Sequence, residues 1–432
     1  MDINSFIEEI TPYVIEKRRE FHEHPEVAWT EYVTSYKIIK ELEKLNCTIH
    51  FGNEIFVTEE RIGLPSQTDI SENEARAMEM GVPSSFIEKM KNGHTGVIAQ
   101  FDTGKPGKHT AFRFDIDALP ILEAEEENHI PFQQKFHSKR AGVMHSCAHD
   151  GHAAIGLGIA QFLYQFTDEL TGRFTVIFQP AEEGGRGAKP IVAKGWLDDA
   201  DYFISGHIGI QSYPVGTIAA TANNFLASSK IDVTYLGKSA HAGLEPNKGR
   251  NALLAAASAA LHLNGITRHA DGATRINIGT LEAGSGRNIV ADLAKMQLET
   301  RGATTELNEE YMVKEAIRII KASANLFDVE EEITFVGSAP NATCDEEWIP
   351  LVKESSADSS LVTNVIDEMS MGASEDATYM MNRVREKGGL ATYMVFCSPL
   401  PAGHHHPKFD FEEMVLPTAI DAISRLVLHI NK

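Results

Sequence analysis

The pattern of hydrophobic and polar positions changes near Asn223 and divides the chain into two kinds of segment. Before this point, short apolar runs bounded by Gly or Pro predict buried strands, and these are "TGVIAQFD" (95–102), "TAFRFDIDALP" (110–120), "RFTVIFQP" (173–180) and "DYFISGHIG" (201–209). A helical pattern, "AIGLGIAQFLYQF" (154–166), lies between them. Strands that alternate with helices predict an α/β fold with a mainly parallel sheet flanked by helices.

After Asn223, polar and apolar residues alternate with a period of two in three runs, "SSKIDVTYLG" (228–237), "RINIGTLEAG" (275–284) and "LAKMQLETRG" (293–302). Helical patterns follow the first and the third run, and "EEITFVG" (331–337) closes the segment. This β-α-β-β-α-β order predicts an inserted ferredoxin-like α+β domain at 225–337. Residues 1–224 and 338–432 are then the two parts of the first domain.

A polar, acidic stretch between Gly52 and Gly93 interrupts the first domain. It is expected to combine loop segments with one or two short helices. Long insertions in compact domains often act as lids or binding loops. Two interpretations therefore stay open, a role in specificity and a decoration without function.

Charge and composition exclude several classes of partner. The 432 residues carry a net charge of −22, whereas nucleic acids and anionic membranes are bound by basic surfaces. The N-terminus lacks the basic and apolar regions of a signal peptide, and no apolar run reaches the roughly 20 residues of a membrane helix. The four cysteines are widely spaced, so no disulfide framework is expected. We expect a cytoplasmic protein that binds neither nucleic acid nor membrane.

Metal-binding residue types are concentrated in "MHSCAHDGHAA" (144–154). Cys147 and His149 are two positions apart, just before a predicted helix, so a thiolate and an imidazole can reach one cleft. His152 follows about one helical turn later and either supports this site or caps the helix. Most single histidines are not metal ligands, but the Cys-x-His pair and its neighbours favour a metal site.

Adjacent carboxylates follow a predicted strand in "FQPAEEGG" (178–185). Like charges this close raise each other's pKa, and a metal ion removes that cost by binding one of them. The other carboxylate is then free to act as a base on a water whose pKa the cation lowers to about 7. Glu182 and Glu183 are therefore candidates for base and ligand; the alternative is a solvated acidic loop.

Two further histidine sites complete the set of candidate ligands. His207 is predicted to end a strand, and "AGHHHPKFDF" (402–411) contains His404, His405 and His406. Open α/β sheets bind ligands at the carboxyl ends of their strands. One Cys, several His and one Glu suit two metal ions, which together can hold a bridging water and polarise a carbonyl.

These motifs together resemble the dinuclear-metal aminoacylase/carboxypeptidase family, which includes hippurate, auxin-conjugate and aminobenzoyl-glutamate hydrolases. The similarity rests on "RREFHEHPE", "RFDIDALP", "MHSCAHDGHAA", "FQPAEEGG", "SAHAG", "GSGRNIV", "SEDA" and "HHPKFDF", in this order along almost the whole chain. The resemblance implies a catalytic domain in two parts, 1–224 and 338–432, and an inserted lid or dimerisation domain at 225–337.

Specific roles follow from the resemblance. It implies metal ligands at Cys147, His149, Glu183, His207 and His405, with His404 as the second choice for the last, and it implies Glu182 as general base. His241 of "SAHAG" would stabilise the oxyanion in a partner subunit, and Arg287 and Asn288 would contact the substrate's carboxylate and carbonyl. An exposed loop histidine and a surface salt bridge are the alternatives for His241 and Arg287. Asp115 and Asp117 are expected to support the site.

One position departs from the family. Ala148 stands where relatives have Gly, so a left-handed backbone there would be strained and could alter ligand geometry or metal preference.

The implied activity is metal-dependent hydrolysis of the amide bond of an N-acyl amino acid. The insertion, "TANNFLASSK" and the ending "AGHHHPKFDF" are most similar to the aminobenzoyl-glutamate hydrolases, which suggests p-aminobenzoyl-glutamate as substrate. A hippurate-like acyl amino acid or a small peptide is the first alternative, and a catalytically inactive metal-binding partner subunit is the second. Two divalent ions are expected; the cysteine favours zinc and the resemblance manganese. The role of His241 requires at least a homodimer, or a heterodimer with a related B subunit.

Overall fold

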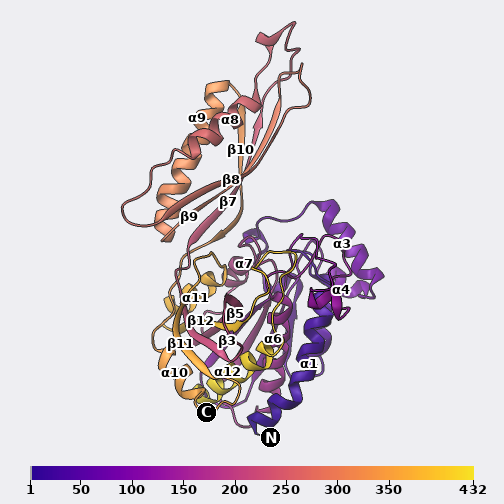
Figure 1. The fold of residues 1–432 in the computed structure, drawn as a ribbon, viewed down its shortest axis with the longest axis vertical. Helices are drawn as coiled ribbons and strands as arrows, with labels where there is room; N and C mark the ends of the chain where they lie inside the picture. The colour runs from indigo at the N-terminus through magenta and orange to yellow at the C-terminus, as the bar shows by residue number, and fades with distance from the viewer. Residues whose placement is uncertain (1) are drawn as a thin grey trace.

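The computed structural model describes residues 2–432 and contains two bodies (Figure 1). The larger body holds both ends of the described chain, and the smaller one projects from it as an elongated arm. The arm contains the strands between Ala227 and Ala339, so the chain leaves the larger body, builds the arm and returns.

The larger body is built on an eight-stranded sheet with the order β1-β2-β4-β3-β5-β12-β6-β11. The strands are β1 (Thr48–Phe51), β2 (Val97–Asp102), β3 (His109–Asp115), β4 (Arg173–Gln179), β5 (Tyr202–Ser212), β6 (Thr217–Asn223), β11 (Asn364–Ser370) and β12 (Leu390–Ser398). Its centre, β4-β3-β5-β12, is parallel, as predicted. The sheet as a whole is mixed, because β1, β2 and β4 pair antiparallel with one another and β6 runs antiparallel to β12.

Helices cover both faces of this sheet, which explains why its central strands are apolar throughout. One core lies under α1 (Ile3–Glu23), α2 (Tyr32–Leu42), α6 (His149–Gln165), α10 (Trp348–Ser355) and α12 (Val415–Ile430). The other lies under α7 (Ala188–Ala193) and α11 (Ala377–Glu386). In β3, Phe112 packs into the first core and the adjacent Ala111 into the second.

The arm has the predicted ferredoxin-like arrangement. Its elements are β7 (Ala227–Leu236), α8 (Ala252–Leu263), β8 (Thr274–Ala283), β9 (Leu293–Gly302), α9 (Lys314–Phe327) and β10 (Glu330–Ala339). The strands pair antiparallel in the order β10-β7-β9-β8. Both helices pack on one face of the sheet, where Ile320 of α9 shares a core with Ile231 and Val233 of β7, and the other face is polar and open. Because the arm has its own sheet and core, we propose residues 225–337 as a domain, with 1–224 and 338–432 as the other.

The stretch between Gly52 and Gly93 is a mixture of loops and short helices, as expected. It contains α3 (Gln67–Glu79) and α4 (Ser84–Lys89), and a further short helix, α5 (Ile130–Gln133), lies beyond it. Ala77 and Ile87 pack with Tyr32 and Val33 of α2 in a small separate core. The insertion is therefore a packed part of the larger body.

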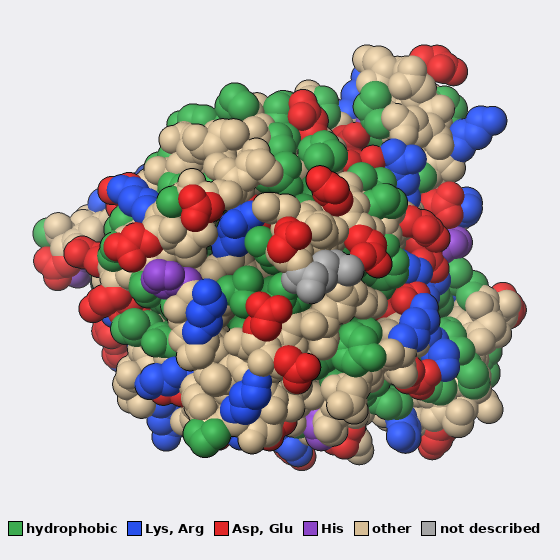
Figure 2. All heavy atoms as spheres, turned by 90° about the horizontal axis from the view of Figure 1, so that it is seen from below, with side chains coloured by type: hydrophobic (Ala, Val, Ile, Leu, Met, Phe, Trp, Pro, Cys, Tyr) green, Lys and Arg blue, Asp and Glu red, His purple; other side chains and the backbone are tan. Residues whose placement is uncertain are grey.

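Acidic and basic side chains are interspersed on the face seen from below the larger body (Figure 2). Within residues 2–432, no helix combines the length and the apolarity that crossing a membrane requires.

Candidate metal centre

The candidate ligands converge on one pocket at the carboxyl end of the parallel strands. Three overlapping groups have their ligand atoms within 4.8 Å of one another: Cys147 with His149 and His207, Cys147 with Glu183 and His405, and His149 with Glu182 and Glu183. They come from the start of α6, the loop after β4, β5 and the loop after β12. One difference from the sequence interpretation is that His207 lies within β5, which continues to Ser212.

A left-handed residue sets the geometry of the Cys-x-His pair. Ala148 has φ 65° and ψ 12° and immediately precedes α6, so His149 is the first residue of that helix. The predicted need for a positive φ at this position is therefore met by a residue with a Cβ. Such a backbone costs roughly 1–2 kcal/mol for a non-glycine residue.

Asp117 holds both the histidine and the glutamate pair. Its carboxylate accepts hydrogen bonds from the backbone N–H groups of Glu182 (3.0 Å) and Glu183 (2.9 Å). Its backbone carbonyl accepts one from Nδ1 of His149 at 2.9 Å. Because Nδ1 makes this bond, Nε2 is the ring nitrogen that faces the pocket. Within residues 2–432, this buried Nε2 has no hydrogen-bond partner, which is the arrangement that a metal ion would satisfy.

His152 supports the site and does not belong to the Cys147 groups. Its Nδ1 pairs with Asp115 at 2.5 Å, and its Nε2 accepts a hydrogen bond from the backbone N–H of Ile208 at 2.9 Å. Arg113 also pairs with Asp115, at 2.6 Å. Although burial opposes it, His149 and Arg113 hold the pKa of Asp115 well below its usual range. Of the two roles left open for His152, the structure favours support.

The thiol of Cys147 lies between two histidines. Its sulfur is 3.6 Å from His207 Nε2 and 3.6 Å from His404 Nδ1. Both rings are fixed from behind, because Nδ1 of His207 bonds the carbonyl of Ile208 and Nε2 of His404 bonds that of Gly209. Burial and the nearby Glu183 raise the pKa of the thiol. A cation would reverse this effect by stabilising the thiolate.

Both candidate histidines of the last motif reach the pocket. His405 Nε2 lies 3.2 Å from Glu183 Oε1, and His404 contacts Cys147. His405 shares a potential metal group with Cys147 and Glu183. Burial lowers the pKa of His404 to about 4, so this ring is neutral.

Glu182 lies beside a cluster of acidic groups that sequence reasoning did not assign. Its carboxylate and those of Glu375 and Asp376 lie within 4.8 Å of one another. Burial and the charge of Glu375 raise the pKa of Glu182 well above its usual value. Arg113 bonds both Glu375 (2.9 Å) and Asp376 (3.0 Å). The motif "SEDA" was the only sequence signal for these contacts, which join residues more than 260 positions apart.

Comparisons with known proteins identify the family of the chain. The profile of peptidase family M20/M25/M40 matches residues 111–429. The chain belongs to this family. It is 41% identical over 428 residues to an indole-3-acetyl-aspartic acid hydrolase of Enterobacter agglomerans and, over the same length, to the A subunit of p-aminobenzoyl-glutamate hydrolase of Escherichia coli, covering 99% of this chain and 98% of each relative. A solved structure of an aminobenzoyl-glutamate utilization protein from Klebsiella pneumoniae superposes with a TM-score of 0.86, at 36% identity, covering 99% of this chain and 98% of that one.

Membership has chemical consequences. A solved structure of the Bacillus subtilis YXEP protein, described as a dinuclear metal-binding peptidase of the M20 family, superposes with a TM-score of 0.66 at 23% identity, covering 98% of each chain. As a member of this peptidase family, the chain is a metal-dependent hydrolase that acts on an amide bond. The potential metal groups around Cys147 and His149 fit this chemistry, since they combine sulfur, nitrogen and oxygen donors.

Three predicted residues are not in the pocket of this chain. His241, Arg287 and Asn288 are exposed and lie near each other at the far end of the arm, where the backbone N–H of Ala242 bonds the carbonyl of Asn288 at 2.9 Å. Nδ1 of His241 accepts hydrogen bonds from the N–H groups of Gly243 and Leu244, both at 3.1 Å. In the neutral ring, the proton is therefore on Nε2, which can donate.

The arm reaches the pocket at its other end. A cavity of about 320 Å³ is lined by the candidate ligands other than His149 and also by Ser228, Lys230 and Arg301 of the arm. An adjoining cavity lies against the insertion, and its apolar walls include Val27, Leu64, Pro65, Leu119, Pro120 and Val336. Arg186 fixes this part of the insertion by donating to the carbonyl of Gly63 at 3.1 Å. The insertion thus forms a wall next to the metal centre.

Proposed function

We propose that the chain hydrolyses the amide bond of an N-acyl amino acid with a free carboxylate, and that p-aminobenzoyl-glutamate is its substrate. The observation that carries the proposal is geometric: the carboxylates of Glu182 and Glu183 lie within 4.8 Å of a buried His149 nitrogen that lacks a partner within residues 2–432. The relatives named for aryl or indolyl amides of acidic amino acids support the choice of substrate.

Two divalent ions, Mn²⁺ or Zn²⁺, are proposed to bind Cys147, His149, Glu183, His207 and His405. Such ions polarise the amide carbonyl and acidify the attacking water. The sulfur donor favours zinc. Activity after loading with each metal, in the experiment below, decides between the two.

Glu182 is proposed as general base. It takes a proton from the attacking water and then passes it to the nitrogen of the leaving amine. The carboxylate of Asp117 keeps the backbone of Glu182 in place, because it accepts a hydrogen bond from the Glu182 N–H. The acyl group would occupy the apolar cavity beside Leu64 and Pro65, which gives the insertion a role in acyl specificity.

His241 is proposed to act in the site of a second subunit, where its Nε2–H donates to the oxyanion of the tetrahedral intermediate. Arg287 and Asn288, from the same tip, would contact the substrate's carboxylate and carbonyl. The exposure of all three within a single chain supports this role. The assembly is then a homodimer, or a heterodimer with a related B subunit such as the name of the Escherichia coli relative implies. A cytoplasmic location remains part of the proposal.

The test is hydrolysis of p-aminobenzoyl-glutamate by the purified protein loaded with Mn²⁺ or Zn²⁺, alone and with a B-type partner, together with elemental analysis. Release of p-aminobenzoate by the wild type and not by a Glu182→Gln variant with unchanged metal content is the expected result. Hippurate and dipeptides serve as the comparison panel, and faster turnover of one of them would replace the substrate. Bound metal without turnover of any amide would instead favour an inactive partner subunit.

A further inference from the structure

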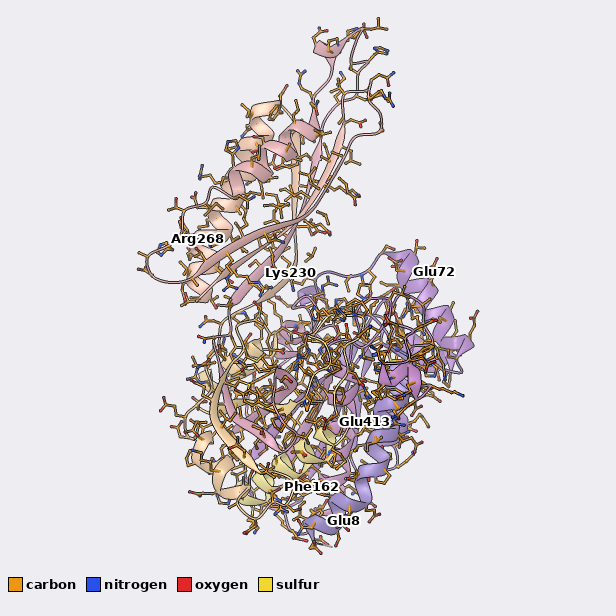
Figure 3. The ribbon with its side chains drawn as sticks, viewed as in Figure 1. Glu8, Glu72, Phe162, Lys230, Arg268 and Glu413 are labelled. Carbon is orange, nitrogen blue, oxygen red and sulfur yellow. The ribbon has the colours of Figure 1, made fainter. Side chains whose placement is uncertain are left out.

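The open face of the arm carries a basic side chain into the catalytic cavity. Lys230 belongs to β7, in which the alternating Ile231 and Val233 pack under the arm's helices, so Lys230 projects from the opposite face. It lies at the junction between the arm and the larger body (Figure 3). It lines the same cavity as Cys147 and Glu182.

Lys230 differs from the other cation that the arm contributes. Arg301 is held by Glu299, whose two carboxylate oxygens accept bonds of 2.9 and 3.3 Å from its guanidinium. Within residues 2–432, by contrast, the ammonium group of Lys230 makes no hydrogen bond and has no carboxylate oxygen within 4.0 Å. Burial lowers its pKa, and the more distant charges of Glu182, Glu183 and the cross-strand Glu299 oppose that shift. A partly desolvated ammonium without a paired anion is stabilised when an anion binds beside it.

The proposed substrate class indicates which anion binds beside the ammonium of Lys230. The scissile amide must lie beside Glu182, so the groups next to it reach the wall formed by Lys230. Lys230 also lines the adjoining cavity, whose apolar walls suit an uncharged acyl group. The carboxylates of the amino acid are then the anionic groups of the substrate that can pair with the ammonium. A neutral amino acid has only its α-carboxylate, which the proposed function assigns to the partner's tip. An acidic amino acid brings a second carboxylate.

We propose that Lys230 binds the side-chain carboxylate of the amino acid released by the reaction and thereby makes the enzyme selective for N-acyl derivatives of glutamate and aspartate. This inference rests on the proposed function and adds a determinant of specificity to it. The competing explanation is that Lys230 only offsets the negative charge of Glu182 and Glu183. The two differ because charge compensation would affect every substrate equally.

The experiment compares N-benzoyl-glutamate with N-benzoyl-glutamine, which has nearly the same shape and lacks the side-chain charge. The wild type should prefer the glutamate compound in kcat/KM. Lys230→Met should lose about 10- to 100-fold in kcat/KM for it and stay within about threefold for the glutamine compound. Lys230→Arg, which keeps the charge, should restore most of the preference. An equal loss for both compounds, or none for either, would overturn the inference.

Lys295→Met is the matched control. Lys295 is on the same open face, in β9 opposite Thr234, and it is exposed and absent from the cavity lining. Its loss should leave the ratio of the two kcat/KM values unchanged, so a general effect of removing a positive charge from the arm is separated from a local one.

A binding measurement keeps the inference separate from the proposed function. Calorimetric titration of the metal-loaded protein with free glutamate and free glutamine should show weaker binding of glutamate to Lys230→Met and little change for glutamine. If the wild type hydrolyses no N-acyl amino acid, the proposed function fails while this titration still decides the role of Lys230. If the wild type hydrolyses both compounds equally well, the proposed function stands and the inference fails.

Discussion

The metal pocket and the tip of the arm are both rich in functional residue types, but they are built in opposite ways. In the pocket, backbone carbonyls hold the rings of His149, His207 and His404 from behind, although His405 is exposed. The N–H groups of Glu182 and Glu183 are bonded to Asp117. At the tip, His241 is exposed and is oriented only by two neighbouring backbone N–H groups. The comparison teaches that the pocket residues are held in place within one chain, whereas the tip residues lack comparable support and, under the proposed function, act in the site of a second subunit.

The largest effect expected is that of removing the base from the pocket. Glu182→Gln keeps the shape of the side chain but cannot accept the proton, so kcat should fall by about 10²–10⁴. Metal content, measured by elemental analysis, should be unchanged. A variant with normal kcat would remove Glu182 from the chemistry and leave the pocket as a binding site only.

The next prediction tests whether the tip acts across subunits. His241→Ala should lower kcat by about 10²–10³, as expected for the loss of one oxyanion donor. Mixing this variant with Glu182→Gln and allowing subunits to exchange creates dimers in which one of two sites is intact. A statistical mixture should regain about a quarter of the wild-type activity, because half of the dimers are mixed and each has one complete site.

The subunit-mixing experiment would give a different result if His241 acted within its own chain. If His241 served the pocket of its own chain, both parents and all mixed dimers would remain inactive. The control is a mixture of Glu182→Gln with Cys147→Ala, two changes in the same pocket.

Much of the fold of the larger body and of the arm could be predicted from the sequence. The elements that were missed have physical explanations. The ferredoxin-like arm was predictable because one face of each strand is polar, which gives a clear period of two. The start of α6 was missed because His149, Asp150 and His152 are buried polar residues and break the apolar pattern. β6 and β11 were missed too, since the first is rich in Ala and Thr and the second lies at the edge of the sheet.

The candidate ligands were found from residue type and order, but their supports were not. Arg113 and Glu375 are joined by a contact that spans 262 positions, and no local pattern encodes such a pairing. Lys230 was missed for a different reason. In an alternating strand, a lysine on the polar face is ordinary, and only the position of the larger body makes it part of a cavity.

A smaller effect is expected from pH, and it should distinguish the buried scaffold from the tip. Burial opposes protonation of His22, but hydrogen bonds to Asp150 (2.8 Å) and Glu123 (2.9 Å) prevail and raise its pKa to about 9. Its contribution to stability is therefore complete below pH 6.5, the ordinary pKa, and is lost as pH rises through 9. The free energy of unfolding should fall by on the order of 3 kcal/mol across this window.

Denaturant titrations at several pH values measure this dependence. His22→Gln should flatten it, and His241→Gln at the exposed tip should leave the wild-type slope. A slope that persists in His22→Gln would assign the titration to another group.

The smallest effect is expected at Ala148. Glycine there would remove roughly 1–2 kcal/mol of left-handed strain. It would also lose a buried methyl group worth about 0.8 kcal/mol and gain unfolded-state entropy worth about 0.5–1 kcal/mol. Ala148→Gly should therefore change the free energy of unfolding by less than about 1 kcal/mol, as measured by denaturant titration. A gain of several kcal/mol would mean that the strain is larger than the backbone angles imply.

The arm joins the larger body only where β7 begins and β10 ends, at Ala227 and Ala339. Lys230 is three residues from the first of these joints, and the six further residues to Leu236 extend the strand by about 20 Å, at about 3.3 Å per residue, before the tip is reached. A rigid lever turning on a pivot displaces its points in proportion to their distance from it. Any rotation of the arm about these joints would thus move His241 over a long distance and Lys230 only slightly. Lys230 would then keep its contact with the bound amino acid while His241 moves toward or away from the site that it serves.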